Sequence, residues 1–118
     1  MKWTIEFYKD SKGISPVEDF ILTLDAKSQA KLLRVIDLLE EFGLGMPYTF
    51  AEKVNDDVWE LKERFGTERY RILYFAFTGQ KFILLHAFIK KTPKTPSDEK
   101  KLADTRRKDY LKRFTKSK

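Results

Sequence analysis

The residues best suited to chemistry lie between Trp59 and Pro96, where cationic side chains alternate with apolar ones. These cations are Lys62, Arg64, Arg69, Arg71, His86, Lys90, Lys91 and Lys94. Side chains on adjacent strands, about 4.8 Å apart, can converge on one anion. Such a cluster can bind a phosphodiester, and it can also stabilise the extra negative charge of a pentacoordinate phosphorane. The first property belongs to a nucleic-acid binder and the second to a nuclease.

Cleavage of RNA is the reaction that suits these side chains. RNA carries its own nucleophile, the 2′-hydroxyl group, so the reaction needs only a base, an acid and stabilisation of charge. His86 is the single histidine, and its reference pKa of about 6.5 makes it the natural proton-transfer group. Lys62 could share this role because neighbouring cations lower the pKa of a lysine. Glu60 is an alternative base.

Two of these residues also have a purely structural interpretation. His86 could be a core residue held by hydrogen bonds within the sheet. Arg71 could form a salt bridge with Glu60 or Glu63. The register of the strands decides between these alternatives, and one sequence does not determine that register.

Other kinds of active site are excluded by residues that the chain lacks. Cysteine is absent, which excludes disulfides, thiolate zinc sites and a cysteine nucleophile, and fits a reducing compartment. No glycine-rich phosphate-binding loop and no GxSxG motif occur. A metal would need carboxylate ligands, and the adjacent pairs Glu40-Glu41 and Asp56-Asp57 cannot converge from one regular element. We expect neither a metal nor a cofactor.

Length and composition predict one globular domain over residues 1–118. The chain is 42% hydrophobic and 36% charged, which is typical of a soluble fold with its own core. Its apolar runs are far shorter than the roughly 20 residues that span a bilayer. The first residues indicate a strand rather than a signal peptide. We expect a cytoplasmic protein with no membrane partner.

Positive charge is concentrated in the last quarter of the chain. Residues 90–118 hold 12 of the 24 Lys and Arg residues but only 4 of the 18 Asp and Glu residues, a balance of +8 within a net charge of +6. Such polarity attracts polyanions, with nucleic acid ahead of acidic protein or acidic membrane. A solvated lysine-rich helix would have the same composition.

The N-terminal half is predicted to form a strand and two helices. Alternating residues indicate a strand over Trp3–Tyr8. A capping serine followed by proline and glutamate predicts a short helix from Pro16 to about Leu24. A capping aspartate and a terminal glycine delimit a longer helix from Ala26 to about Phe42.

The C-terminal half begins with a loop and three strands. The loop covers 44–53, and its aromatic residues Tyr48 and Phe50 are expected to anchor it to the core; the alternative is that they stack on bases. Alternation predicts three antiparallel strands joined by short turns, over about Val58–Phe65, Tyr70–Phe77 and Lys81–Ile89. Strict alternation in the last strand would place His86 on the same face as Phe82.

A basic helix is predicted to end the chain. Thr95 is its expected cap, with Pro96 at the first helical position, and it runs to about Phe114. The element order is β-α-α-β-β-β-α. This order predicts an α+β sandwich in which an antiparallel sheet of about four strands carries two helices on one face, leaving the other face free to bind.

Three stretches of the sequence resemble a known family. They read WELK at 59–62, YRILY at 70–74 and LHAFIKKTPKTP at 85–96. The resemblance is to the HigB-like, phage-derived branch of the RelE/ParE toxin superfamily, whose FxKKTxKTP motif is matched from Phe88 to Pro96. It covers nearly the whole chain and implies a RelE-like sandwich, because the superfamily has the same order of elements.

The resemblance implies a small toxin that cleaves mRNA without a metal, usually on the translating ribosome. Its expected partner is a HigA-like antitoxin with a helix-turn-helix DNA-binding domain. Operator DNA would be bound only through that antitoxin, since the pair commonly represses its own operon.

The resemblance also implies roles for individual residues. Arg71 corresponds to the arginine that contacts the scissile phosphate, Lys62 to a strand lysine of RelE-like active sites, and His86 to the proton-transfer histidine of HigB toxins. These three are the expected catalytic residues. Lys90, Lys91 and Lys94 fall where the family makes further phosphate contacts. Arg64 and Arg69 are also expected to bind RNA, because they belong to the row of cations on the predicted strands. The chain departs from RelE where Glu60 replaces a second active-site lysine, and Tyr110 is only a weak counterpart of its C-terminal tyrosine.

Two other functions stay open. A ParE-like toxin shares the fold but inhibits DNA gyrase and cleaves no RNA. A non-catalytic module could bind nucleic acid through the basic segment 90–118, with steep salt dependence and no product.

Overall fold

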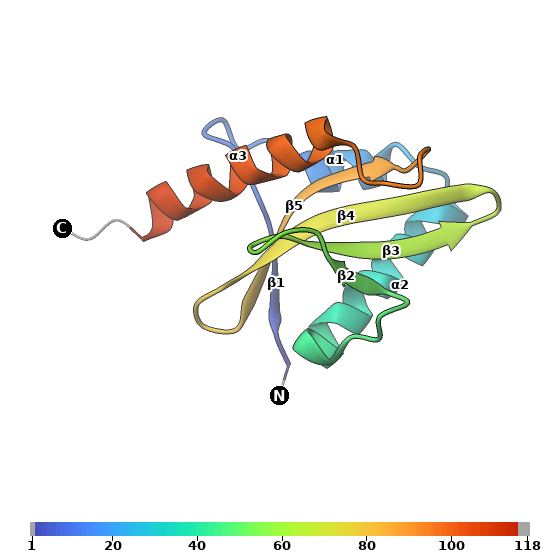
Figure 1. Cartoon of the computed structure of the whole chain (residues 1–118), viewed down its shortest axis with the longest axis horizontal. Coiled ribbons are helices and arrows are strands. Elements are labelled where there is room, and N and C mark those ends of the chain that lie inside the picture. Colours follow the sequence, from blue (N-terminus) through green and yellow to red (C-terminus); the bar gives the residue numbers. More distant parts are fainter. Residues whose placement is uncertain (1, 116–118) are drawn as a thin grey trace.

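The computed structural model describes residues 2–115, which form one five-stranded mixed sheet and three α-helices. The strands are ordered β1-β5-β4-β3-β2 (Figure 1). The elements are β1 (Thr4–Phe7), α1 (Pro16–Leu22), α2 (Ala26–Phe42), the 3-10 helix η1 (Gly43–Gly45), β2 (Ala51–Lys53), β3 (Trp59–Phe65), β4 (Glu68–Phe77), β5 (Lys81–Ile89) and α3 (Ser97–Phe114). The predicted α+β class is confirmed. Within the described residues, no helix is long and apolar enough to cross a membrane.

The prediction of about four antiparallel strands was wrong in two respects. A fifth strand, β2, forms inside the segment predicted as a loop, and its Ala51 pairs with Leu61. Three residues are too few to show an alternating pattern. In addition, β1 pairs with β5 in parallel, which alternation cannot reveal because its period is the same in both directions.

Local signals position α1 and α2. Ser15 and Asp25 each accept a hydrogen bond from a backbone N–H in the first turn of their helix. The helix α1 ends two residues earlier than predicted, whereas α2 ends at Phe42 as predicted, and its C-cap is Gly43 with φ of +55°. A Cβ atom on Gly43 would lie 2.2 Å from Trp3 Nε1, so only glycine fits beside the indole ring.

The start of α3 differs from the prediction. Its N-cap is Pro96, and no side chain caps it. The hydroxyl group of Thr95, expected to cap this helix, instead donates a hydrogen bond to Glu60 Oε2 at 3.0 Å. Thr95 therefore ties the segment before α3 to β3.

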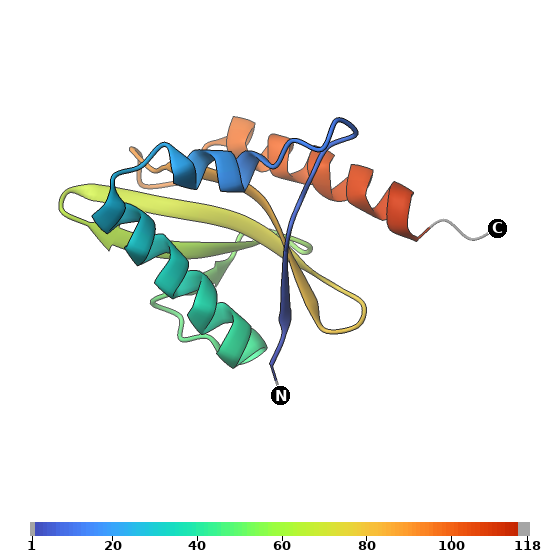
Figure 2. The ribbon, with the colours of Figure 1, turned by 180° about the vertical axis from the view of Figure 1, so that it is seen from behind.

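Helices cover both faces of the sheet, which corrects the prediction of one open face. Figures 1 and 2 show α1 and α2 on one side and α3 on the other. The first core contains Leu32, Leu39, Leu61 and Ile72, and the second contains Leu73, Phe75, Leu85, Ala103 and Tyr110. Because β4 contributes to both cores, it is apolar on both faces, as predicted. The helix α3 packs on β4 and β5. It leaves open the end of β3 near the β3–β4 turn.

A β-bulge in β5 decides where His86 lies. Leu73 pairs with His86 but the next residue, Tyr74, pairs with Leu84, so Leu85 is the extra residue. Strict alternation therefore fails at this point. The predicted face for His86 was wrong, since the bulge moves it away from the face of Phe82 and onto the α3 face.

Candidate functional site

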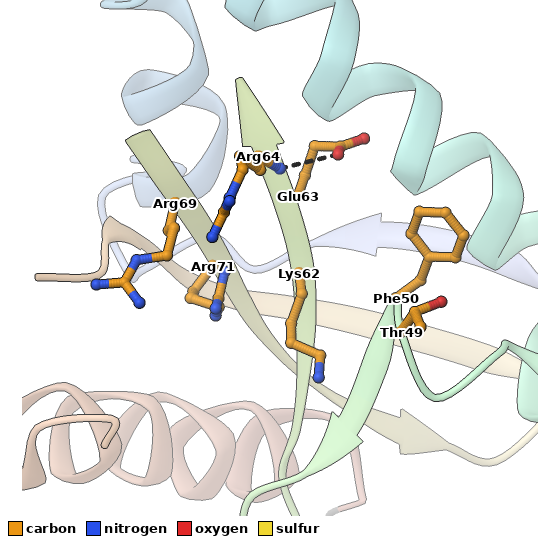
Figure 3. A pocket seen from close by; sticks show the side chains of 7 residues that line it. All are labelled: Thr49, Phe50, Lys62, Glu63, Arg64, Arg69 and Arg71. Carbon is orange, nitrogen blue, oxygen red and sulfur yellow. Dashed lines mark hydrogen bonds between the residues drawn. The ribbon is translucent and has the colours of Figure 1, made fainter. Parts of the chain in front are cut away.

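An open hollow of about 210 Å³ lies beside the β3–β4 turn. We call it the arginine pocket, and its lining residues are Thr49, Phe50, Lys62, Glu63, Arg64, Arg69 and Arg71 (Figure 3). The strands β3 and β4 supply the charged residues, and the loop before β2 supplies the other two. In Figure 3 the guanidinium group of Arg64 reaches toward Arg71, with Lys62 and Arg69 on either side.

The strand register places the four cations of the pocket in two opposed pairs. Lys62 lies opposite Arg71, and Arg64 lies opposite Arg69. This register follows from a two-residue turn in which Gly66 has φ of +62°. Like charges directly opposite each other destabilise a sheet. A bound anion would relieve that repulsion.

Only one of the two pairs has carboxylate partners. Lys62 Nζ lies 2.9 Å from Glu52 Oε1, and Arg71 Nε lies 3.0 Å from Glu60 Oε2. Arg64 and Arg69 take part in no ion pair within residues 2–115. Their two guanidinium groups therefore line the hollow without a counterion from the described part of the chain.

Arg71 is the most deeply placed of these cations, with 9% of its surface exposed. Its Nη1 donates a hydrogen bond to the carbonyl oxygen of Tyr70 at 2.9 Å. The contact between its Nε and Glu60 is an ion pair whose angle does not satisfy a hydrogen bond, so this buried N–H lacks a hydrogen-bond partner among the described residues. Burial lowers the pKa of Arg71, and the carboxylate of Glu60 opposes that shift. The side chain still remains a cation at neutral pH.

Glu60 connects Arg71 to the segment after β5. It is only 4% exposed, and besides Arg71 its Oε2 accepts the hydroxyl hydrogen of Thr95 and lies 3.8 Å from Lys90 Nζ. A carboxylate held by three partners is poorly placed to act as a base. Of the structural interpretations of Arg71, the salt bridge to Glu60 is the one observed.

His86 lies outside the arginine pocket, in a second group that we call the histidine cluster: His86, Glu99 and Arg106. His86 Nε2 lies 2.5 Å from Glu99 Oε1, and its Nδ1 lies 3.1 Å from Arg106 Nη1. Arg106 Nη1 also donates to the carbonyl oxygen of the bulge residue Leu85, at 2.9 Å. The ring stacks on Phe88, with ring centroids 5.5 Å apart. Both ring nitrogens are thus bound to α3.

Burial lowers the pKa of His86 below its usual value. Glu99 opposes this shift, whereas the charge of Arg106 adds to it. The geometry agrees, because an N–H of Arg106 points at Nδ1 and leaves only Nε2 to carry a proton. His86 is therefore a neutral imidazole at pH 7, donating to Glu99.

The structure divides the predicted site residues into three groups. Lys62, Arg64, Arg69 and Arg71 converge in the arginine pocket. Lys90 turns inward toward Glu60, while Lys91 and Lys94 are exposed in the segment before α3. His86 is held under α3. Its catalytic role stays a prediction, and it would require α3 to move.

Sequence reasoning missed Glu52, which holds Lys62. The residue lies on β2, opposite Glu60, so recognising that short strand was the only route to it. Among residues 2–115, no three His, Asp or Glu side chains are grouped closely enough to hold a metal ion.

Comparison with models of protein families identifies the family of this chain. A family model described as phage-derived, Gp49-like protein (DUF891) matches residues 19–108. That span contains every residue of the arginine pocket and of the histidine cluster. No curated protein matches the chain.

Proposed function

The chain belongs to the phage-derived, Gp49-like family, a RelE/HigB-like family of toxins from toxin-antitoxin systems, and from that premise we propose that it is an endoribonuclease. In this proposal it is a HigB-like toxin that cleaves mRNA on the translating ribosome without a metal. The family implies an antitoxin partner. We propose that this partner is HigA-like, with a helix-turn-helix domain that binds the operator DNA. Its substrate would place the toxin in the cytoplasm.

The opposed arginines carry this proposal. Arg64 and Arg69 face each other across β3 and β4 and have no carboxylate partner among the described residues. A structural ion-pair network would place acids between them. Two uncompensated guanidinium groups in an open hollow instead suit a phosphodiester, which each can bind through paired N–H groups.

The same pocket suits the charge changes of RNA cleavage. The 2′-oxygen loses its proton and attacks the adjacent phosphorus, and the bond from phosphorus to the 5′-oxygen then breaks. The departing 5′-oxygen takes up a proton, so the products are a 2′,3′-cyclic phosphate and a 5′-hydroxyl group. Arg71 and Arg64 would stabilise the extra negative charge of the phosphorane. Lys62 is the nearest candidate for proton transfer, and His86 could take part only after α3 moves aside.

The exposed lysines extend the proposed RNA surface. Lys91 and Lys94 lie in the segment before α3, next to the Glu60 and Thr95 contact that fixes this segment to the sheet. They would contact phosphates farther along the strand. Lys90 would act indirectly, because its amino group is directed at Glu60.

Inducible expression tests the proposal. Wild-type protein should arrest growth, and primer extension on cellular mRNA should map cuts that the Arg71→Ala and Arg64→Ala/Arg69→Ala variants no longer make. Lys27→Ala, on α2 and not among the residues that line the pocket, is the matched charge control. If folded pocket variants cut mRNA as well as Lys27→Ala, the pocket is not the active site.

One observation favours a ParE-like gyrase inhibitor as the second candidate. The pocket contains no histidine, and the single histidine of the chain is covered by α3. A toxin that only binds its target needs no proton-transfer group. This candidate predicts DNA damage and intact mRNA after induction, whereas the nuclease predicts the reverse.

A further inference from the structure

Tyr48 is an exposed aromatic residue at the rim of the arginine pocket. It directly precedes Thr49 and Phe50, which line the hollow. The two aromatic residues of this loop were expected to anchor it to the core, and Phe50 does pack against the first core. Tyr48 does not, because 71% of its surface is exposed. Core packing therefore does not explain this side chain.

The ring of Tyr48 is nevertheless held at two points. Its hydroxyl group donates to Glu52 Oε2 at 3.1 Å, and Lys62 Nζ lies 4.7 Å from the ring centroid. The other oxygen of the same carboxylate, Glu52 Oε1, binds Lys62. One carboxylate thus orients both the pocket lysine and the exposed ring. A side chain that is exposed and also oriented loses little conformational freedom when a ligand stacks on it.

Other exposed aromatic side chains lack this placement. Within residues 2–115, Phe42 and Phe114 are also large and exposed, but they end α2 and α3 and do not line the pocket. Phe114 packs on Tyr110, with ring centroids 4.5 Å apart. Tyr48 differs from both, because the two residues that follow it, Thr49 and Phe50, line the pocket and so does Lys62, whose amino group lies over its ring.

We propose that Tyr48 is a stacking platform for a nucleobase of single-stranded RNA whose phosphate is bound by Arg64, Arg69 and Arg71. This inference rests on the proposed RNA-binding function of the pocket. A positively charged groove beside an aromatic ring is the arrangement that binds single strands, because the backbone follows the cations and a base stacks on the ring. The platform accepts any base, since every base has a π-face. It rejects a duplex, whose bases are already stacked and paired.

Anisotropy measurements with an RNA that cannot be cleaved test this inference. The probe is a short 2′-O-methyl RNA oligonucleotide, which lacks the nucleophile, and the comparison probe has the same backbone with abasic sites throughout. The variants are Tyr48→Ala and Tyr48→Phe, with Phe42→Ala as the matched control at an exposed ring outside the pocket.

The expected result separates the ring from the charge. Stacking contributions predict that Tyr48→Ala binds the base-bearing probe about 5- to 100-fold more weakly and binds the abasic probe as the wild type does. Tyr48→Phe keeps the ring and should stay within about threefold of the wild type, as should Phe42→Ala.

Three results would overturn the inference. Equal weakening of both probes by Tyr48→Ala would mean that Tyr48 only positions Lys62. No weakening of either probe would mean that no base stacks there, with the RNA-binding function intact. Failure of the wild type to bind either probe would remove the platform, whereas the proposed function itself is removed only if primer extension also finds no cuts in cellular mRNA.

Discussion

The arginine pocket and the histidine cluster lie on the same face of one sheet, yet they handle charge in opposite ways. In the pocket, Arg64 and Arg69 lie opposite each other and line the hollow, and no carboxylate within residues 2–115 pairs with either of them. In the cluster, both nitrogens of His86 have partners on α3, and the ring is half-buried, with 13% of the side chain exposed. Both groups consist of residues that suit nuclease chemistry. Exposure and pairing, rather than residue type, distinguish the open arginine pocket from the cluster that holds α3.

Arg71 lies between these two cases. It lines the pocket, but like His86 it has a buried carboxylate partner. The sharpest test of this comparison therefore removes Glu60, the carboxylate partner of Arg71, and measures the stability of the folded protein.

Glu60→Ala is expected to have the largest effect on stability, lowering the free energy of unfolding by about 3–5 kcal/mol. The substitution leaves Arg71 without its counterion and removes the acceptor of the Thr95 hydroxyl group. Glu52→Ala is the matched control: it lies opposite Glu60, but 42% of its side chain is exposed, so we expect a loss of about 1 kcal/mol or less. Urea unfolding measures both, and equal losses would contradict the buried role of Glu60.

His86→Ala is expected to cost about 2–3 kcal/mol of unfolding free energy, because Glu99 and Arg106 lose their partner and a cavity opens beside Phe88. Affinity for uncleavable RNA should stay within about threefold of the wild type, since His86 is outside the pocket. Arg64→Ala is the control, with unchanged or higher stability. If His86→Ala kept full stability but lost mRNA cleavage, the structural role of the histidine cluster would be contradicted and His86 would be a catalytic residue.

Arg64→Ala and Arg69→Ala are each expected to weaken RNA binding by about tenfold at physiological salt and to leave stability unchanged or slightly raised. Each substitution removes one of two like charges that lie directly opposite each other in the sheet. Repulsion in the folded state therefore falls, while the RNA loses a cationic contact. The slope of log affinity against log salt should fall by about 0.7 for each cation removed. Lys27→Ala, on the opposite side of the sheet, should change neither quantity.

Much of this fold was predictable because its signals are local. The caps of α1 and α2, the glycine that ends α2 and the alternation of β3, β4 and β5 all lie within a few residues of the element they define. The opposed arginines do not belong to this class, because their pairing depends on the strand register, which the sequence left open. In the structure a two-residue turn at Gly66-Thr67 fixes that register and brings Arg64 opposite Arg69.

The position of the His86 side chain under α3 was not predictable, because it depends on two non-local features. The bulge at Leu85 moves the side chain to the other face, and nothing in the alternation of β5 marks the extra residue. The docking of α3 then buries it, although that helix has only a weak apolar stripe, with Ala103 and Tyr110 its buried residues. Glu52 was missed for a related reason, since β2 is defined by its pairing with β3 rather than by its own sequence.

The smallest expected effect is a dependence of stability on pH that comes from the histidine cluster alone. Burial holds the pKa of His86 below the value of about 6.5 that it has in the unfolded chain. As the pH falls through 6.5, the unfolded state therefore gains a proton that the folded state does not bind, and stability falls, by at most about 1.4 kcal/mol per pH unit. Urea unfolding between about pH 7 and pH 5.5 should show this slope in the wild type and in Arg64→Ala, but not in His86→Gln. Stability that rose on acidification would mean that Glu99 holds a protonated His86, and that the cluster, like the pocket, carries charge.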